Sequence, residues 1–321
     1  MPSILETPLT GSMAWRSETL LPNDGKVVLD ADCLTEIKQV AQELGSNPFP
    51  IEALKPEMFA MPNCRATMAS VREQIEDGIG FAIIDRIPLD EIKVETAKKI
   101  YWLLMNMVSQ TVAQKWDGTL VYDVTDTHVK EAAGNGIRSS KTNSGQSFHT
   151  DNAFNLPPSH VALFCLQTAR EGGISGLVSL ETVYNDLLEN HTDCLHRLYE
   201  PFYFDRQREH GDGEKLTSFK PIAIYDGKNI EFNFSPRLVQ QGYKVEGIDM
   251  ETATKNAIQT LIDVSEKTYY CKSFEFEIGQ IQIVNNRRLG HRRTAYTDDP
   301  DAPRHLIRLW LRNHGKPYYA G

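Results

Sequence analysis

The chain has 321 residues, of which 40% are hydrophobic and 24% are charged, a balance typical of a globular protein that buries a substantial core. It carries 34 lysines and arginines against 43 aspartates and glutamates, and the net charge of −9 argues against a general affinity for nucleic acid or anionic membranes. Five scattered cysteines without CxxC pairs, and no signal-peptide pattern or long apolar run, favour a cytoplasmic protein without a membrane anchor.

The first third of the chain is predicted to be mostly helical. Apolar residues recur at helical spacing in three segments, with a short strand-like run between the last two. The predicted helices cover 33–45, 68–78 and 88–112, and the predicted strand covers 80–85.

From about residue 119 onward, β-branched and aromatic residues alternate with polar ones and predict strands. The predicted strands cover 119–124, 160–169, 221–227, 229–234, 273–284 and 305–313. The turn "DGKN" predicts that 221–227 and 229–234 form a hairpin. Two helices interrupt this region, one over 179–190 with Ser179 as its N-cap and one over 249–267.

Helices followed by many strands, without regular βα alternation, argue against a doubly wound sheet. We predict an α+β fold whose core is a jelly roll, that is, a double-stranded β-helix, flanked by helices. The sequence contains no internal repeat or flexible linker, so we expect one domain over residues 1–321. Its helical part would cover about 1–118 and its jelly-roll core about 119–321.

The stretch "SFHTDNAF" places His149 and Asp151 two positions apart, so on a strand both side chains point to the same side. The pair fits either a surface ion pair or two metal ligands, and HxD alone is weak evidence. His291, at the end of "GQIQIVNNRRLGH", is the candidate for a third ligand. Two imidazoles and one carboxylate on one face suit iron(II) and leave three coordination positions open.

The segment "RHLIRLWLR" predicts a strand with Arg304 and Arg308 on one face and Ile307 and Leu309 on the other. An arginine fork binds a carboxylate through two contacts, so these two arginines could hold a 2-oxo diacid and a substrate acid beside a metal. The alternative is that both are surface charges on an edge strand.

Taken together, "FHTD", "REGGIS", "NNRRLGH" and "RHLIRLWLR" resemble the iron(II)/2-oxoglutarate-dependent dioxygenases of the taurine dioxygenase and clavaminate synthase type, over about residues 76–313. The resemblance implies that His149, Asp151 and His291 are the iron ligands. The acidic ligand Asp151 implies hydroxylation, or another C–H oxidation, in preference to halogenation.

The same resemblance implies the residues that bind the cosubstrate. Arg304 would pair with the distal carboxylate of 2-oxoglutarate, and Arg308 would meet the cosubstrate or a substrate carboxylate. Ser175, in "GGIS", stands where many members have a threonine whose hydroxyl contacts 2-oxoglutarate. The implied reaction uses iron(II), 2-oxoglutarate and dioxygen, yields succinate and carbon dioxide, and oxidises a small molecule, an amino acid or another carboxylate.

Substrate contacts are expected from the loop "SSKTNSGQSF" and from the residues just after the ligands. Asn143 and Gln146 could hydrogen-bond a polar substrate, and Phe154 could form a wall of the pocket. Ordinary loop polarity and core packing are the alternatives. The charged stretch 205–215 could be a lid or a solvated loop.

Two other functions fit parts of the pattern. A non-catalytic metal-binding jelly-roll sensor could keep the three ligands, but Arg304 and Ser175 would then have no evident purpose. A zinc hydrolase would need a glutamate general base, and the sequence shows none beside the triad. The substrate, the carbon that is oxidised and the formation of a homo-oligomer stay open.

Overall fold

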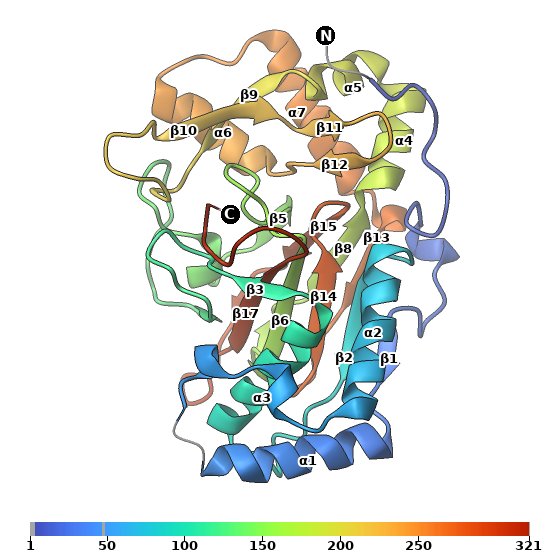
Figure 1. Cartoon of the computed structure of the whole chain (residues 1–321). Coiled ribbons are helices and arrows are strands. Elements are labelled where there is room, and N and C mark those ends of the chain that lie inside the picture. The colour runs from blue at the N-terminus through green and yellow to red at the C-terminus, as the bar shows by residue number, and fades with distance from the viewer. Residues whose placement is uncertain (1–3, 47–48, 321) are drawn as a thin grey trace.

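The computed structural model describes residues 4–46 and 49–320, and these form an α+β fold with helices at both ends of a β-rich centre (Figure 1). The helices are α1 (Ala31–Gly45), α2 (Pro62–Glu76), α3 (Val94–Val108), α4 (Leu180–Asn190), α5 (Thr192–Leu198), α6 (Pro236–Glu246) and α7 (Thr252–Ser265). No helix in the described ranges is both long enough and apolar enough to cross a membrane.

The larger sheet has seven strands in the order β1-β2-β14-β6-β17-β3, with β4 also paired to β17. All neighbours in it are antiparallel except β1 and β2. Its strands are β1 (Lys26–Val28), β2 (Phe81–Asp85), β3 (Gln110–Val112), β4 (Tyr122–Val124), β6 (His160–Gln167), β14 (Ile281–Asn285) and β17 (His305–Arg312).

The smaller sheet has four antiparallel strands in the order β13-β8-β15-β5. They are β5 (Gln146–His149), β8 (Ser175–Ser179), β13 (Cys271–Phe274) and β15 (Leu289–Arg293). Three two-stranded ribbons complete the β-structure: β7 (Glu171–Gly172) with β16 (Tyr296–Thr297), β9 (Pro201–Asp205) with β10 (Thr217–Pro221), and β11 (Ala223–Tyr225) with β12 (Ile230–Phe232).

Successive side chains along a strand point to opposite faces of its sheet. Each of the two sheets therefore has an inner face, toward the other sheet, and an outer face covered by helices. Ile307 and Leu309 of β17 belong to the core that α1, α2 and α3 form over the outer face of the larger sheet. Trp310, next along the strand, packs with Leu177 and Leu289 of the smaller sheet, which places it between the sheets. Helices α4 to α7 form a third core on the outer side of the smaller sheet. The space between the sheets is where Arg308 also lies.

The N-terminus of α2 is capped by another helix. Met61 provides no side-chain cap, and instead Glu36 of α1 accepts hydrogen bonds from the backbone N–H groups of Asn63 (2.9 Å) and Cys64 (2.9 Å). Burial alone would raise the pKa of Glu36, but these two amides outweigh it and hold the pKa below its ordinary 4.5. The contact therefore fixes α1 against α2 through a charged group.

Most predicted elements are confirmed, including the jelly-roll class, the hairpin of β11 and β12, and Ser179 as the N-cap of α4, which accepts from Thr182 N. The predicted strand 273–284 is wrong as one element. It is two strands, β13 and β14, that lie in different sheets, because the chain turns at Gly279 (φ +91°), where an added Cβ would lie 2.3 Å from Ile87 O.

Two boundaries also differ from the prediction. The helix expected over 88–112 begins only at Val94 and ends at Val108, and β3 follows it. The part expected to be helical, about 1–118, supplies β1, β2 and β3 to the larger sheet. Strands of three residues are too short for a period of two to be read, so only pairing in the folded chain reveals them.

We expect Glu36→Gln to lower the free energy of unfolding by about 1–2 kcal/mol, because the two α2 amides lose a charged acceptor. The folded-state pKa lies below 4.5, so the wild-type advantage is complete above that pH and is lost as the pH falls through the folded pKa. Urea unfolding at about pH 7 and about pH 4 measures both effects. Glu43→Gln, on the exposed side of α1, is the control, and an equal loss in the two variants would contradict the capping role.

Candidate active site

The first two candidate ligands lie where β5 ends. His149 is the last residue of β5, and Asp151 lies in the loop that follows. Asn286, between β14 and β15, fixes this loop: its side-chain oxygen accepts from Asp151 N (2.7 Å), and its side-chain nitrogen donates to Asp151 O (3.0 Å). The turn that leads to His291 therefore also sets the position of Asp151.

The third candidate, His291, lies on β15 directly across from His149 in the antiparallel pair. The centroids of the two imidazole rings are 4.4 Å apart. Oδ1 of Asp151 lies 3.5 Å from Nε2 of His149 and 3.7 Å from Nε2 of His291. One ligand atom from each residue lies within 4.8 Å of the others, so the three converge on one point.

The imidazoles are held in the form that a metal ligand needs. Nδ1 of His149 lies 2.9 Å from Ser147 O, which fits a proton on Nδ1 and leaves the Nε2 lone pair toward Asp151. Burial and the neighbouring His149 lower the pKa of His291, which favours its neutral form.

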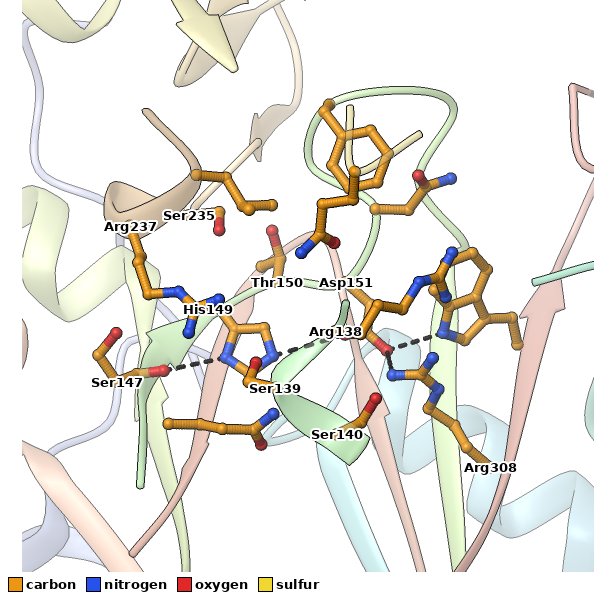
Figure 2. A pocket seen from close by; sticks show the side chains of 16 residues that line it. Arg138, Ser139, Ser140, Ser147, His149, Thr150, Asp151, Ser235, Arg237 and Arg308 are labelled. Atoms are coloured by element: carbon orange, nitrogen blue, oxygen red, sulfur yellow. Dashed lines mark hydrogen bonds and ion pairs between the residues drawn. The ribbon is translucent and has the colours of Figure 1, made fainter. Parts of the chain in front are cut away.

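Asp151 is buried and oriented by two donors from β17. Its Oδ2 accepts from Nε1 of Trp310 (2.7 Å) and lies 3.0 Å from Nη1 of Arg308, so Oδ1 is left for the imidazole side (Figure 2). Burial alone would raise the pKa of Asp151, but the Arg308 guanidinium outweighs it and holds the pKa well below its ordinary value. The carboxylate is therefore ionised and fixed in direction.

This donor set fits a ferrous ion. Two imidazoles and one ionised carboxylate on one side of a point are the ligands of non-haem iron(II) sites that keep open positions. No thiolate takes part, because the five cysteines are free and none belongs to the group. The pocket beside His291 leaves space for further ligands.

That pocket contains the predicted cosubstrate residues. Ser175 and Arg304 line it together with His291 and Asp151. Arg304 is 4% exposed, its Nη1 is buried without a hydrogen-bond partner among the described residues, and its guanidinium lies 5.2 Å from the Tyr296 ring centroid. Gly173 (φ +70°) gives it room, because a Cβ there would lie 3.0 Å from Nε of Arg304. A buried cation without a partner suits an anionic ligand.

Arg308 lines the same pocket, but most of its contacts are already made. Besides Asp151, it donates from Nε to Oε1 of Gln114 (2.8 Å), and Gln114 in turn donates to the Arg308 carbonyl (2.8 Å). Only Nη2 is buried without a partner in the described part of the chain. The geometry makes Arg308 first of all the counter-charge of Asp151.

A second pocket, beside His149, shares His149 and Asp151 with the first and extends to Ser235 and to Arg237 of α6 (Figure 2). Gln146 lines both pockets, and Phe154 lines this one. Arg138 and Arg237 also line it, and each is paired with an acid, Arg138 with Glu209 (2.7 Å) and Arg237 with Glu131. The loop expected as a lid contributes Gln207 to the wall.

Asn143 does not join these residues. It is exposed and lines neither pocket, and its contact with the site region is through its backbone, where the carbonyl accepts from Tyr296 N (3.1 Å). The expectation that its side chain meets a substrate stays a prediction, and the lining of neither pocket supports it.

Several site residues were missed by the sequence reasoning. Trp310 lies two positions after Arg308, so the same period of two that paired Arg304 with Arg308 could have identified it. Asn286 is part of the quoted "NNRRLGH" motif but has no local signal for its role. Arg138 and Arg237 come from a long loop and from α6, and only the folded chain brings them to His149.

Trp310→Phe removes the indole donor to Asp151 while keeping an aromatic side chain. We expect iron(II) or manganese(II) affinity to fall about 10–100-fold, because a group that orients a ligand is lost. Competition with a coloured chelator measures this affinity. Trp116→Phe, at a half-exposed position, is the matched control, and unchanged metal affinity in Trp310→Phe would contradict the orienting role.

Comparison with known proteins places this geometry in a family. Residues 53–310 match the family described as "Taurine catabolism dioxygenase TauD, TfdA family". The chain is 26% identical to FR-33289 synthase of Streptomyces rubellomurinus (strain ATCC 31215), over 97% of this chain and 92% of that protein. It is also 26% identical to the taurine hydroxylase-like protein SAT17 of Stachybotrys chartarum (strain CBS 109288 / IBT 7711), over 94% and 79%.

Solved structures show the same fold. Asparagine oxygenase matches with a TM-score of 0.68 and 17% identity, covering 90% of this chain and 93% of that one. The non-haem iron oxygenase OrfP, in complex with iron, succinate and (3S)-hydroxy-L-Arg, matches with a TM-score of 0.65 and 14% identity, covering 90% and 94%. The family match spans well over half of the sequence and confirms the resemblance found in its motifs. The chain therefore belongs to the TauD, TfdA family of dioxygenases, and it is an enzyme that uses iron(II), 2-oxoglutarate and dioxygen.

Proposed function

We propose that His149, Asp151 and His291 bind the iron(II) of this dioxygenase. The observation that carries the proposal is the convergence of their three ligand atoms within 4.8 Å, with Asp151 ionised and oriented from behind. Arg304 and Ser175, in the adjoining pocket, would bind the distal carboxylate of 2-oxoglutarate through the guanidinium and the hydroxyl. When bound, iron(II) supplies the activation of dioxygen that couples decarboxylation of 2-oxoglutarate to oxidation of a substrate C–H bond.

The side chains of this chain position the reactants and keep bulk water away. Trp310 and Arg308 keep Asp151 from rotating, and the Ser147 carbonyl keeps the His149 ring turned toward Asp151. Val161 and Leu163 of β6 form an apolar part of the wall of the cosubstrate pocket. A pocket of this kind confines an oxidising reaction to the bound substrate.

We propose that the substrate is a small amino acid or other carboxylate that enters the pocket beside His149. Arg138, Arg237, Ser235 and Gln146 offer donors for an acid and for other polar groups (Figure 2). Structures with this fold have been solved with 3-hydroxyasparagine and with hydroxylated arginine, which supports an amino-acid substrate as the first to test. Hydroxylation is the expected outcome, because the acidic ligand Asp151 is retained.

The two other functions are less well supported. A zinc hydrolase needs a general base, and no glutamate lines either pocket among the described residues. A metal-binding sensor would leave Arg304 as a buried cation without a purpose. The proposed setting remains a cytoplasmic, single-domain enzyme, supported by five free thiols and by a family match from residue 53 to residue 310.

Anaerobic addition of iron(II) and then 2-oxoglutarate to the metal-free protein is expected to produce a weak visible metal-to-ligand charge-transfer band. Asp151→Ala and His291→Ala should each abolish the band, because each removes one of three ligands. Succinate release in the presence of candidate amino acids then identifies the substrate. A protein that develops no band, or that is active with zinc alone, would rule out the proposed site.

Arg304→Ala is expected to weaken 2-oxoglutarate binding by about 2–5 kcal/mol, because a buried charge loses its partner. Iron(II) affinity should stay close to that of the wild type, since Arg304 forms no ion pair with His149, Asp151 or His291. Titration of the charge-transfer band with 2-oxoglutarate measures the affinity for 2-oxoglutarate. Arg287→Ala, which removes a surface partner of Glu231, is the control. If the two variants bind 2-oxoglutarate equally well, Arg304 is not part of the site.

A further inference from the structure

A second arginine faces the cosubstrate pocket from the smaller sheet. Arg293 lies two positions after His291 on β15 and lines the same pocket as Arg304 and Ser175. In the sheet it is paired with Ser175 of β8 on one side and with Gln146 of β5 on the other. Its position is therefore set by three paired strands and does not depend on a flexible loop.

The hydrogen bonds of Arg293 use only one end of its guanidinium. Nη2 donates to the carbonyls of Thr142 (3.0 Å) and Ser144, in the loop that precedes β5. Nε and Nη1 are buried and have no hydrogen-bond partner among the described residues. Arg293 as a whole is 5% exposed, so water at the surface does not solvate these two donors.

Arg293 and Arg304 both lie close to one aromatic ring. Their guanidinium carbons are 4.7 Å and 5.2 Å from the centroid of the Tyr296 ring. Neither forms an ion pair with a carboxylate in the described ranges, whereas Arg138, Arg237 and Arg308 each have an acidic partner. The ring face attracts both cations but does not neutralise them.

Two buried cations of the same sign without an acid are costly for the folded protein. The cost is offset if an anion completes the arrangement when a ligand binds. A carboxylate has two oxygens and about four acceptor positions, enough for donors from two arginines and a serine hydroxyl. Arg293 and Arg304 line one pocket and each has a donor that is unpartnered in the described part of the chain, so a single carboxylate can serve both.

We propose that Arg293 is a second binding residue for the distal carboxylate of 2-oxoglutarate, which it shares with Arg304. The inference rests on the proposed function of this pocket and adds a specificity-determining residue to it. Two arginines at one end make the pocket selective for a 2-oxo diacid over a 2-oxo acid that ends in a methyl group. The Nη2 bonds to Thr142 and Ser144 hold the guanidinium in the direction that this contact needs.

The test compares two ligands in the iron(II)-loaded protein under anaerobic conditions, by isothermal titration calorimetry. 2-Oxoglutarate carries the distal carboxylate, and 2-oxobutanoate keeps the metal-chelating end but lacks that group. Arg293→Met should weaken 2-oxoglutarate binding about tenfold or more, because hydrogen bonds to a charged group are lost. Binding of 2-oxobutanoate should change by less than about twofold. Arg287→Met is the matched control and should change neither.

A purely structural role for Arg293 gives a different result. If the arginine only ties down the loop at Thr142 and Ser144, Arg293→Met weakens both ligands by the same factor, and this outcome would overturn the inference. Should Arg293→Met fail to fold, as judged by circular dichroism, Arg293→Lys replaces it. Lysine keeps the positive charge but lacks the forked donors of the guanidinium. Arg293→Lys should therefore weaken 2-oxoglutarate binding less than Arg293→Met would, and it should again leave 2-oxobutanoate binding unchanged.

The wild-type protein separates this inference from the proposed function. If the iron(II)-loaded wild type binds no 2-oxoglutarate, the assignment of the pocket itself is wrong. If the wild type binds it and prefers it to 2-oxobutanoate, but Arg293→Met keeps the same preference, only the role of Arg293 is wrong.

Discussion

The rest of the site depends on the buried carboxylate of Asp151. A charge in the space between two sheets is tolerated only when it is paired and hydrogen-bonded, and Arg308 and Trp310 of the larger sheet provide both requirements. The same contacts turn the other carboxylate oxygen toward two imidazoles from the strands β5 and β15 of the smaller sheet. One residue thus joins the sheets and defines the metal-binding direction.

The arginines around this carboxylate are divided by what they already contact. Arg308 is the counter-charge of Asp151, and Arg138 and Arg237 have acidic partners in the pocket beside His149. Arg293 and Arg304, in the pocket beside His291, have none in the described part of the chain. An anion therefore gains most in the pocket beside His291, whereas a ligand in the pocket beside His149 has to compete with, or share, existing ion pairs. This difference in charge pairing gives a physical reason why the cosubstrate and the substrate would bind in separate pockets.

The helical layers make this arrangement rigid. Helices α1 to α3 cover the outer face of the larger sheet, with Glu36 joining α1 to α2, and α4 to α7 cover the other side (Figure 1). Ligands on strands that are packed on both faces move less than ligands on loops. Asn286 extends this rigidity to the loop that carries Asp151.

The sequence by itself determined the fold class, the candidate ligands His149, Asp151 and His291, and the shared face of Arg304 and Arg308, because these follow from motifs and from a period of two along a strand. It did not determine that 273–284 divides between two sheets, that Asn143 lines neither pocket, or that Trp310 and Arg308 hold Asp151. Those features depend on which strands pair and which faces meet, and a strand carries no local signal for its partner. Only the packing of the two sheets brings residues more than a hundred positions apart to one carboxylate, and only that packing shows which buried charges still lack a partner.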